Sequence, residues 1–127
     1  MWLFTRDGFF SVVCARQGDG AHGRSVDLSK VMVRARSHRH LEALKARHAQ
    51  HLAACDIVEF PGSDYACRLF VDKATWTTVV ADMADDIDYD NFKAAVGRHR
   101  PSADRASEAA LHDVWQVMYD LQATGGR

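Results

Sequence analysis

Five aspartates lie close together in the segment DMADDIDYDNF, residues 82 to 92, and no basic residue separates them. They are Asp82, Asp85, Asp86, Asp88 and Asp90. Carboxylate oxygens are ligands for Ca²⁺ and Mg²⁺, so the spacing raises the question of a cation site. Residues 86, 88 and 90 match positions 1, 3 and 5 of a calcium loop, but its twelfth position is Gly97, where a bidentate glutamate is required. We therefore expect no tightly bound metal in the cluster, and a magnesium site stays open as the alternative.

The same aspartates suit a junction between two helices. Asp88 or Asp90 is predicted to cap the following helix, because a negative charge is favourable at the positive end of the helix dipole. The first three aspartates fall in the last turns of the preceding helix, where the dipole disfavours acids. We expect those three to face water or to meet a basic partner, and Arg34 or Arg98 is the expected partner of Asp85 and Asp86.

Four histidines fall between residues 38 and 51, and imidazole is a common zinc ligand. They are His38, His40, His48 and His51. His48 and His51 could share one face of a helix, but no cysteine or acid at ligand spacing completes a tetrahedral set. We expect no metal here and a half-buried core position for His48. The chain also has no GxSxG, no GxGxxG and no phosphate loop ending in GK[ST], so no catalytic residue and no cofactor is predicted.

Alternate residues of two predicted strands carry arginines, aromatics and a methionine. In VMVRAR and CRLFV, one alternating set is apolar and is predicted to face the core. The opposite set is Met32, Arg34, Arg36, Arg68 and Phe70, joined by either Phe9 or Phe10. A sheet face of this kind can stack on and neutralise nucleic acid, or it can be the self-complementary face of a dimer. We expect it to be the binding surface.

Composition limits the class of protein. The 127 residues suit one ordinary domain, and 47% apolar with 26% charged residues is typical of a globular protein. The net charge of −1 argues against bulk affinity for nucleic acid or anionic membranes. Cys14, Cys55 and Cys67 are odd in number and widely spaced, which favours reduced core cysteines. No signal peptide and no span of ~18 to 20 apolar residues is found, so we expect a cytoplasmic protein without membrane contact.

Hydrophobic periodicity predicts the elements that position these side chains. We expect strands over 1–37 with a break near Asp7, a helix over 38–54 capped by Ser37, and a strand pair over 56–72. Asp72 caps the helical part, 73–122, and the tail 123–127 should fray. The prediction is a single α+β domain over 1–127, with an antiparallel sheet, helices on one face and the order β-β-α-β-β-α-α-α. A ferredoxin-like arrangement stays open. The last helix is predicted to bury Leu111, Val114, Trp115, Met118 and Leu121.

Several stretches are familiar when taken together: MWLFTRDGFFSVV, VMVRAR, DYACRLFV, DIDYDNFKAAV and VWQVMYDLQ. In that order they resemble a family of small uncharacterised bacterial proteins. The resemblance covers most of the chain and leaves out the glycine loop and the 97–107 linker. The resemblance implies a bacterial cytoplasmic protein. The family brings no established activity, cofactor or catalytic residue, so no site is carried over.

Three classes of function follow. The leading hypothesis is a non-catalytic protein-binding or regulatory module that forms a homodimer or a higher oligomer. The first alternative is a nucleic-acid-binding module that uses Arg34, Arg36 and Arg68. The second alternative is a small enzyme with an acid such as Asp64 or Asp88 in a cleft, and it has the least support because no catalytic motif is present.

Overall fold

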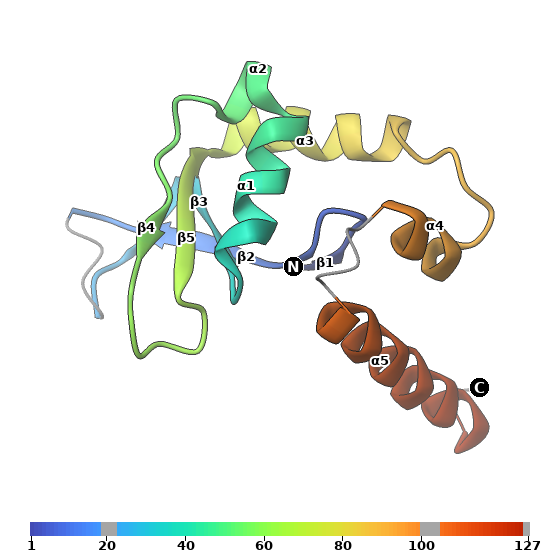
Figure 1. Ribbon diagram of the computed structural model, residues 1–127. Coiled ribbons are helices and arrows are strands. Elements are labelled where there is room, and N and C mark those ends of the chain that lie inside the picture. Colours follow the sequence, from blue (N-terminus) through green and yellow to red (C-terminus); the bar gives the residue numbers. More distant parts are fainter. Residues whose placement is uncertain (19–22, 100–104, 126–127) are drawn as a thin grey trace. The chain divides into compact units, whose positions relative to one another are not determined.

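The computed structural model describes residues 1–18, 23–99 and 105–125 (Figure 1). Contacts divide the chain into two compact units, Met1–Asp88 and Tyr89–Arg127. The first unit holds the sheet and three helices, and the second holds two helices. The predicted α+β class, with an antiparallel sheet and helices, is confirmed. The prediction of a single domain over 1–127 stays a prediction.

The sheet has five strands in the order β1-β2-β3-β5-β4. The strands are β1 (Trp2–Phe4), β2 (Phe9–Arg16), β3 (Val26–Ala35), β4 (Val58–Glu59) and β5 (Cys67–Asp72). The N-terminal stretch forms two strands because a turn closes between them, where the Thr5 N–H donates to the Gly8 carbonyl at 2.9 Å. All four strand pairings are antiparallel. Strand β5 lies between β3 and β4, so β3, the following helix and β4 form a split βαβ unit of the kind found in ferredoxin-like folds.

One face of the sheet forms the core. Because side chains alternate along a strand, every second residue of β2, β3 and β5 points to this inner face. Phe10, Val33 and Leu69 are fully buried there, and the helices supply Leu41 and Leu44. The predicted inward set of Val31, Val33 and Ala35 is confirmed.

Helices α1 (His38–Arg47) and α3 (Lys73–Asp85) pack against β3 and β5 on this inner face, and α2 (Ala49–Leu52) adds Leu52 to the core. The helix predicted over 38–54 is interrupted at His48, whose backbone leaves the helical region at φ −113° and ψ 40°. Ser37 and Asp72 occupy the predicted N-cap positions, although neither side chain makes a capping hydrogen bond. Ile87 follows the end of α3 and is 60% exposed.

In the second unit, α4 (Phe92–His99) packs against α5 (Arg105–Ala123). The N-cap of α4 is Asn91, whose side-chain Oδ1 accepts from the Ala94 N–H at 3.0 Å. This corrects the prediction that Asp88 or Asp90 caps the helix. Asparagine caps as well as aspartate does, and residue 91 is the one directly before the first helical turn. Gly97 lies inside this helix.

Within the second unit, α5 buries none of its own side chains. The helix itself was predicted correctly, apart from its start at residues 101–104, which lies outside the described residues. Its predicted burial is wrong: Trp115, Met118 and Leu121 are 47%, 58% and 57% exposed. Periodicity shows that a helix has an apolar face but does not show what covers that face.

Candidate functional site

The outer face of the sheet carries the predicted binding surface. Met32, Arg34, Arg68 and Phe70 lie on the face opposite the core, with Met32 directly across from Phe70 and Arg34 directly across from Arg68. One row crosses all five strands on this face, through Trp2, Ser11, Arg34, Arg68 and Val58. We use the name arginine face for Met32, Arg34, Arg36, Arg68 and Phe70 together with the aromatic residues that contact them.

Tyr65 is the centre of the arginine face. Its side chain is only 5% exposed, because the guanidinium groups of Arg34 and Arg36 lie over the ring at 4.6 and 4.2 Å from its centroid. Arg34 also donates from Nη2 to the Ser11 hydroxyl at 2.8 Å. A cation–π contact stabilises by about 0.5 to 2 kcal/mol, depending on how far it is desolvated. Both arginines are therefore held in place before any partner arrives.

Arg68 is held at the opposite side of the face by a second set of contacts. Its guanidinium lies 4.3 Å from the centroid of the Phe60 ring. It donates to the Tyr65 carbonyl at 3.4 Å and to the Ser63 hydroxyl at 3.3 Å, and it contacts the Met32 sulfur at 3.5 Å. The turn before β5 thus fixes the orientation of Arg68.

The positive charge of this face is not balanced locally. Within residues 1–18, 23–99 and 105–125, none of Arg34, Arg36 and Arg68 forms an ion pair with a carboxylate. Their hydrogen-bond partners are neutral oxygens and sulfur. Three guanidinium groups of fixed orientation therefore present charge to whatever binds the face.

Aromatic side chains extend the face to the edge strand β1. Phe9 lies on the outer side and Phe10 in the core, which settles the choice left open by the sequence. Phe4 stacks on Phe9 at 4.7 Å between ring centroids, and Trp2 meets Phe9 edge-on at 5.7 Å. Trp2 is 68% exposed. Sequence reasoning missed Trp2 and Tyr65 as members of the face, although the alternation that placed Phe9 outside also places Trp2 there once β1 pairs with β2.

The aspartates are not gathered into one site. Asp82 meets His51, with 3.2 Å between Oδ2 and Nε2, and Asp88 pairs with Arg6 at 3.0 Å. Arg6 also donates to the Asp86 carbonyl at 3.0 Å, so it closes the C-terminal end of α3. Arg34, one of the two basic partners expected for Asp85 and Asp86, contacts Tyr65 and Ser11 instead. Asp85 and Asp90 are exposed.

The residues proposed for an enzyme lie in water. Asp64 is exposed in the turn before β5, and the Asp88 side chain is 74% exposed. A general acid usually needs an enclosed position to raise its pKa. Cys67 is enclosed, but burial, assisted by the negative charge of Glu59, raises the pKa of its thiol, which disfavours the nucleophilic thiolate.

His48 occupies the core, as predicted, and is more deeply buried than expected. It is 3% exposed, and its Nε2 has no hydrogen-bond partner among the described residues. Burial lowers the pKa of this imidazole because water no longer stabilises the charged form.

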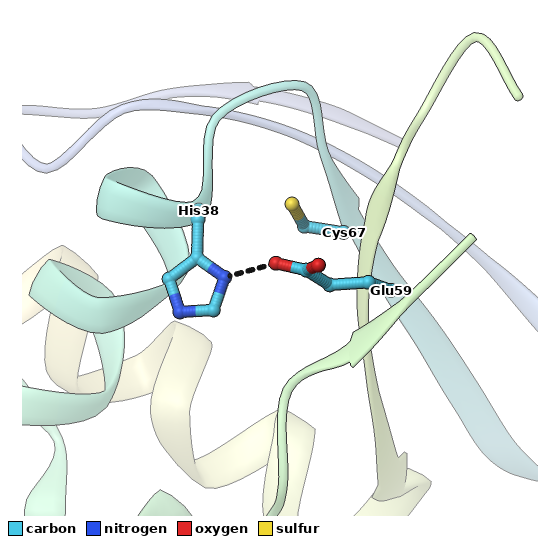
Figure 2. A group of neighbouring side chains, drawn as sticks. All are labelled: His38, Glu59 and Cys67. Carbon is cyan, nitrogen blue, oxygen red and sulfur yellow. Dashed lines mark hydrogen bonds and ion pairs between the residues drawn. The ribbon is translucent and has the colours of Figure 1, made fainter. Parts of the chain in front are cut away.

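His38 is one of the four histidines for which the sequence indicated no complete set of metal ligands. The structure brings it together with Glu59 and Cys67, two residues far along the chain (Figure 2). The spacing rule missed this group because its members come from a helix and two strands.

No helix in the described part of the chain is both long and apolar enough to cross a membrane. In comparisons with protein-family models, curated protein sequences and solved structures, no match to this chain was found. The resemblance to a family of small bacterial proteins therefore stays an expectation, and the arginine face carries the inference about function.

Proposed function

We propose that this chain is a non-catalytic protein-interaction module that self-associates through the arginine face. One observation carries the proposal: the outer face of the sheet combines exposed apolar side chains with arginines that have no carboxylate partner among the described residues. Phe70, Val58 and Phe60 are 39%, 38% and 39% exposed there.

The residue types on the face favour protein as the partner. Tryptophan, tyrosine, phenylalanine, methionine and arginine are enriched in protein interfaces, whereas lysine and glutamate are depleted. A folded monomer rarely exposes a large contiguous apolar patch to water. The expected homodimer or higher oligomer would cover these side chains. The proposal keeps the expected cytoplasmic setting, which is supported by three cysteines that are all unpaired.

Sedimentation velocity at micromolar concentration tests self-association. Wild-type protein is expected to sediment as a species heavier than the 14.2 kDa chain. Phe70→Glu should shift the protein to the monomer, because it replaces an apolar ring by a carboxylate that would have to lose its water in the interface. Ile87→Glu is the matched control, since it makes the same change at an exposed apolar residue outside the sheet. A wild-type protein that sediments only as monomer would refute self-association.

A nucleic-acid-binding module is the second candidate, because three unpaired guanidinium groups on one face can neutralise phosphates. The geometry favours it less. Bases stack on free aromatic rings, and here arginines already cover the rings of Tyr65 and Phe60.

Fluorescence anisotropy with single- and double-stranded oligonucleotides at low salt separates the two candidates. A phosphate-binding face would lose affinity steeply with salt, and Arg36→Ala would reduce the slope of log K against log salt by about 0.7 to 0.9 for each phosphate that is no longer neutralised. The protein-interaction proposal expects no binding of either probe.

A further inference from the structure

Three side chains with metal-binding atoms meet where α1 begins beside the edge of the sheet (Figure 2). His38 is the first residue of α1, Glu59 ends β4, and Cys67 begins β5. One ligand atom from each residue lies within 4.8 Å of the other two. Glu59 and Cys67 are direct partners in the antiparallel ladder, so the backbone holds their side chains side by side.

These three atoms form a ligand set suited to zinc. An imidazole nitrogen, a carboxylate oxygen and a thiolate sulfur all bind Zn²⁺, whereas Ca²⁺ and Mg²⁺ prefer oxygen alone. Zinc bonds of about 2.0 to 2.3 Å place tetrahedral ligand atoms about 3.3 to 3.6 Å apart. His38 Nδ1 and Glu59 Oε1 are 2.9 Å apart, so they must separate slightly to admit the ion. Their side chains are 43% and 59% exposed, and therefore have room to rotate.

A second carboxylate approaches the far side of the same imidazole. Glu42, one turn along α1, lies 3.5 Å from His38 Nε2. A histidine that binds a metal through one nitrogen usually donates its other N–H to a carboxylate, which fixes the tautomer and the ring orientation. Without a cation, two carboxylates can both accept from this ring only if it carries two protons. A metal on Nδ1 is compatible with the same geometry when the ring carries a single proton, on Nε2.

The site is rigid on one side and open on the other. Cys67 is 5% exposed and belongs to the core cluster, so its sulfur is fixed by packing. His38 and Glu59 are exposed and leave the fourth position of a tetrahedron facing water. Three protein ligands with an open position are typical of zinc sites that bind water or a further ligand.

We propose that His38 Nδ1, a Glu59 carboxylate oxygen and the Cys67 sulfur bind one zinc ion, with Glu42 positioning the imidazole. The ion replaces the proton shared between His38 and Glu59 and takes its third bond from the cysteine as thiolate. Binding therefore releases protons to solvent and joins α1 to the β4–β5 pair.

Cobalt substitution tests the thiolate bond directly. The reduced, metal-free protein is titrated with Co²⁺ and then with Zn²⁺ in competition with a chromophoric chelator. One equivalent should bind and give a thiolate-to-cobalt charge-transfer band, and zinc should displace it. Cys67→Ser should abolish the band. His38→Gln and Glu59→Gln should each weaken zinc binding at least tenfold, and Glu42→Gln should weaken it by about 10- to 100-fold.

Matched variants keep the test specific. Cys14→Ser removes a different cysteine, and His112→Gln removes an exposed histidine of α5. Both should bind like wild type. His38 and Glu59 are exposed, so their variants should keep the wild-type circular dichroism and separate loss of binding from loss of fold. The proposal is overturned if no saturable binding occurs at micromolar zinc, if the band survives in Cys67→Ser, or if His38→Gln binds as tightly as wild type.

Discussion

Replacing Asp7 by asparagine should destabilise the first unit strongly. Asp7 lies in the turn between β1 and β2, and its carboxylate receives two N–H groups from Arg47 in the last turn of α1. The distances are 2.6 Å from Nε to Oδ2 and 3.1 Å from Nη2 to Oδ1. The Asp7 side chain is 6% exposed and that of Arg47 is 26% exposed. The hydrogen bond that Asp7 accepts raises the pKa of Arg47. A guanidinium stays protonated even without such a partner, so Asp7→Asn leaves the cation in place.

The magnitude follows from this burial. Removing one partner of a buried pair costs about 3 to 5 kcal/mol, because the remaining charge loses its hydrogen-bonded counterion. Arg47 keeps some contact with water, so we expect the lower end, about 3 kcal/mol. The same turn offers an internal control, since neighbouring Arg6 pairs with Asp88, whose side chain is 74% exposed. Asp88→Asn should cost only ~0 to 1 kcal/mol, because the Asp88 carboxylate lies in water and Arg6, although it is 19% exposed, keeps its hydrogen bond to the Asp86 carbonyl.

Urea denaturation of both variants measures the difference. With a slope of roughly 2 kcal/mol per molar urea, Asp7→Asn should lower the midpoint by about 1.5 M, and Asp88→Asn by less than about 0.5 M. A double-mutant cycle with Arg47→Met isolates the pair, and its coupling energy should account for most of the loss. If Asp7→Asn costs no more than Asp88→Asn, burial of the pair does not determine its contribution and the reasoning is wrong.

Three further perturbations have defined outcomes. Burial lowers the pKa of His48 in the folded protein below 6.5, so the unfolded chain binds a proton at this residue first. The free energy of unfolding therefore falls as the pH drops below 6.5. His48→Leu should reduce that pH dependence by up to about 1.4 kcal/mol per pH unit, measured by urea denaturation. Asn91→Ala should destabilise α4 by about 0.5 to 2 kcal/mol, measured by thermal melts, whereas Asp90→Ala should change little. Gly8→Ala should destabilise the protein by about 1 to 3 kcal/mol, because the added Cβ would lie 2.6 Å from the Cβ of His40. Thermal melts measure this loss, and a melting temperature equal to that of the wild type would contradict the prediction.

The residues that followed a simple period were predicted well. Strict alternation in β3 and β5 was enough to place Arg34 and Phe70 on the outer face and Val33 in the core. Periodicity alone could not give the partners of those side chains. Tyr65 precedes its strand and so belongs to no alternating set, although it organises the arginine face.

Groupings that depend on strand register were beyond the sequence. Glu59 and Cys67 become neighbours only because a hairpin of defined length pairs β4 with β5. His38 joins them because the chain enters α1 next to that hairpin, as Figure 2 shows. The capping error at α4 has a smaller physical origin. Asn91 and the acids before it are all competent caps, and the start of the helix decided among them.

The exposed apolar side chains of α5 affect how often different parts of the chain unfold locally. In proteins a helix gains most of its stability from burying one face, and α5 buries none of its side chains. Its amide protons should therefore exchange with deuterium through local opening, far faster than those of β3, whose neighbours on both sides protect it. Exchange rates along the chain would then fall into two classes. A molecule that slows the hydrogen–deuterium exchange of α5 alone would thereby be identified as a binding partner of this helix.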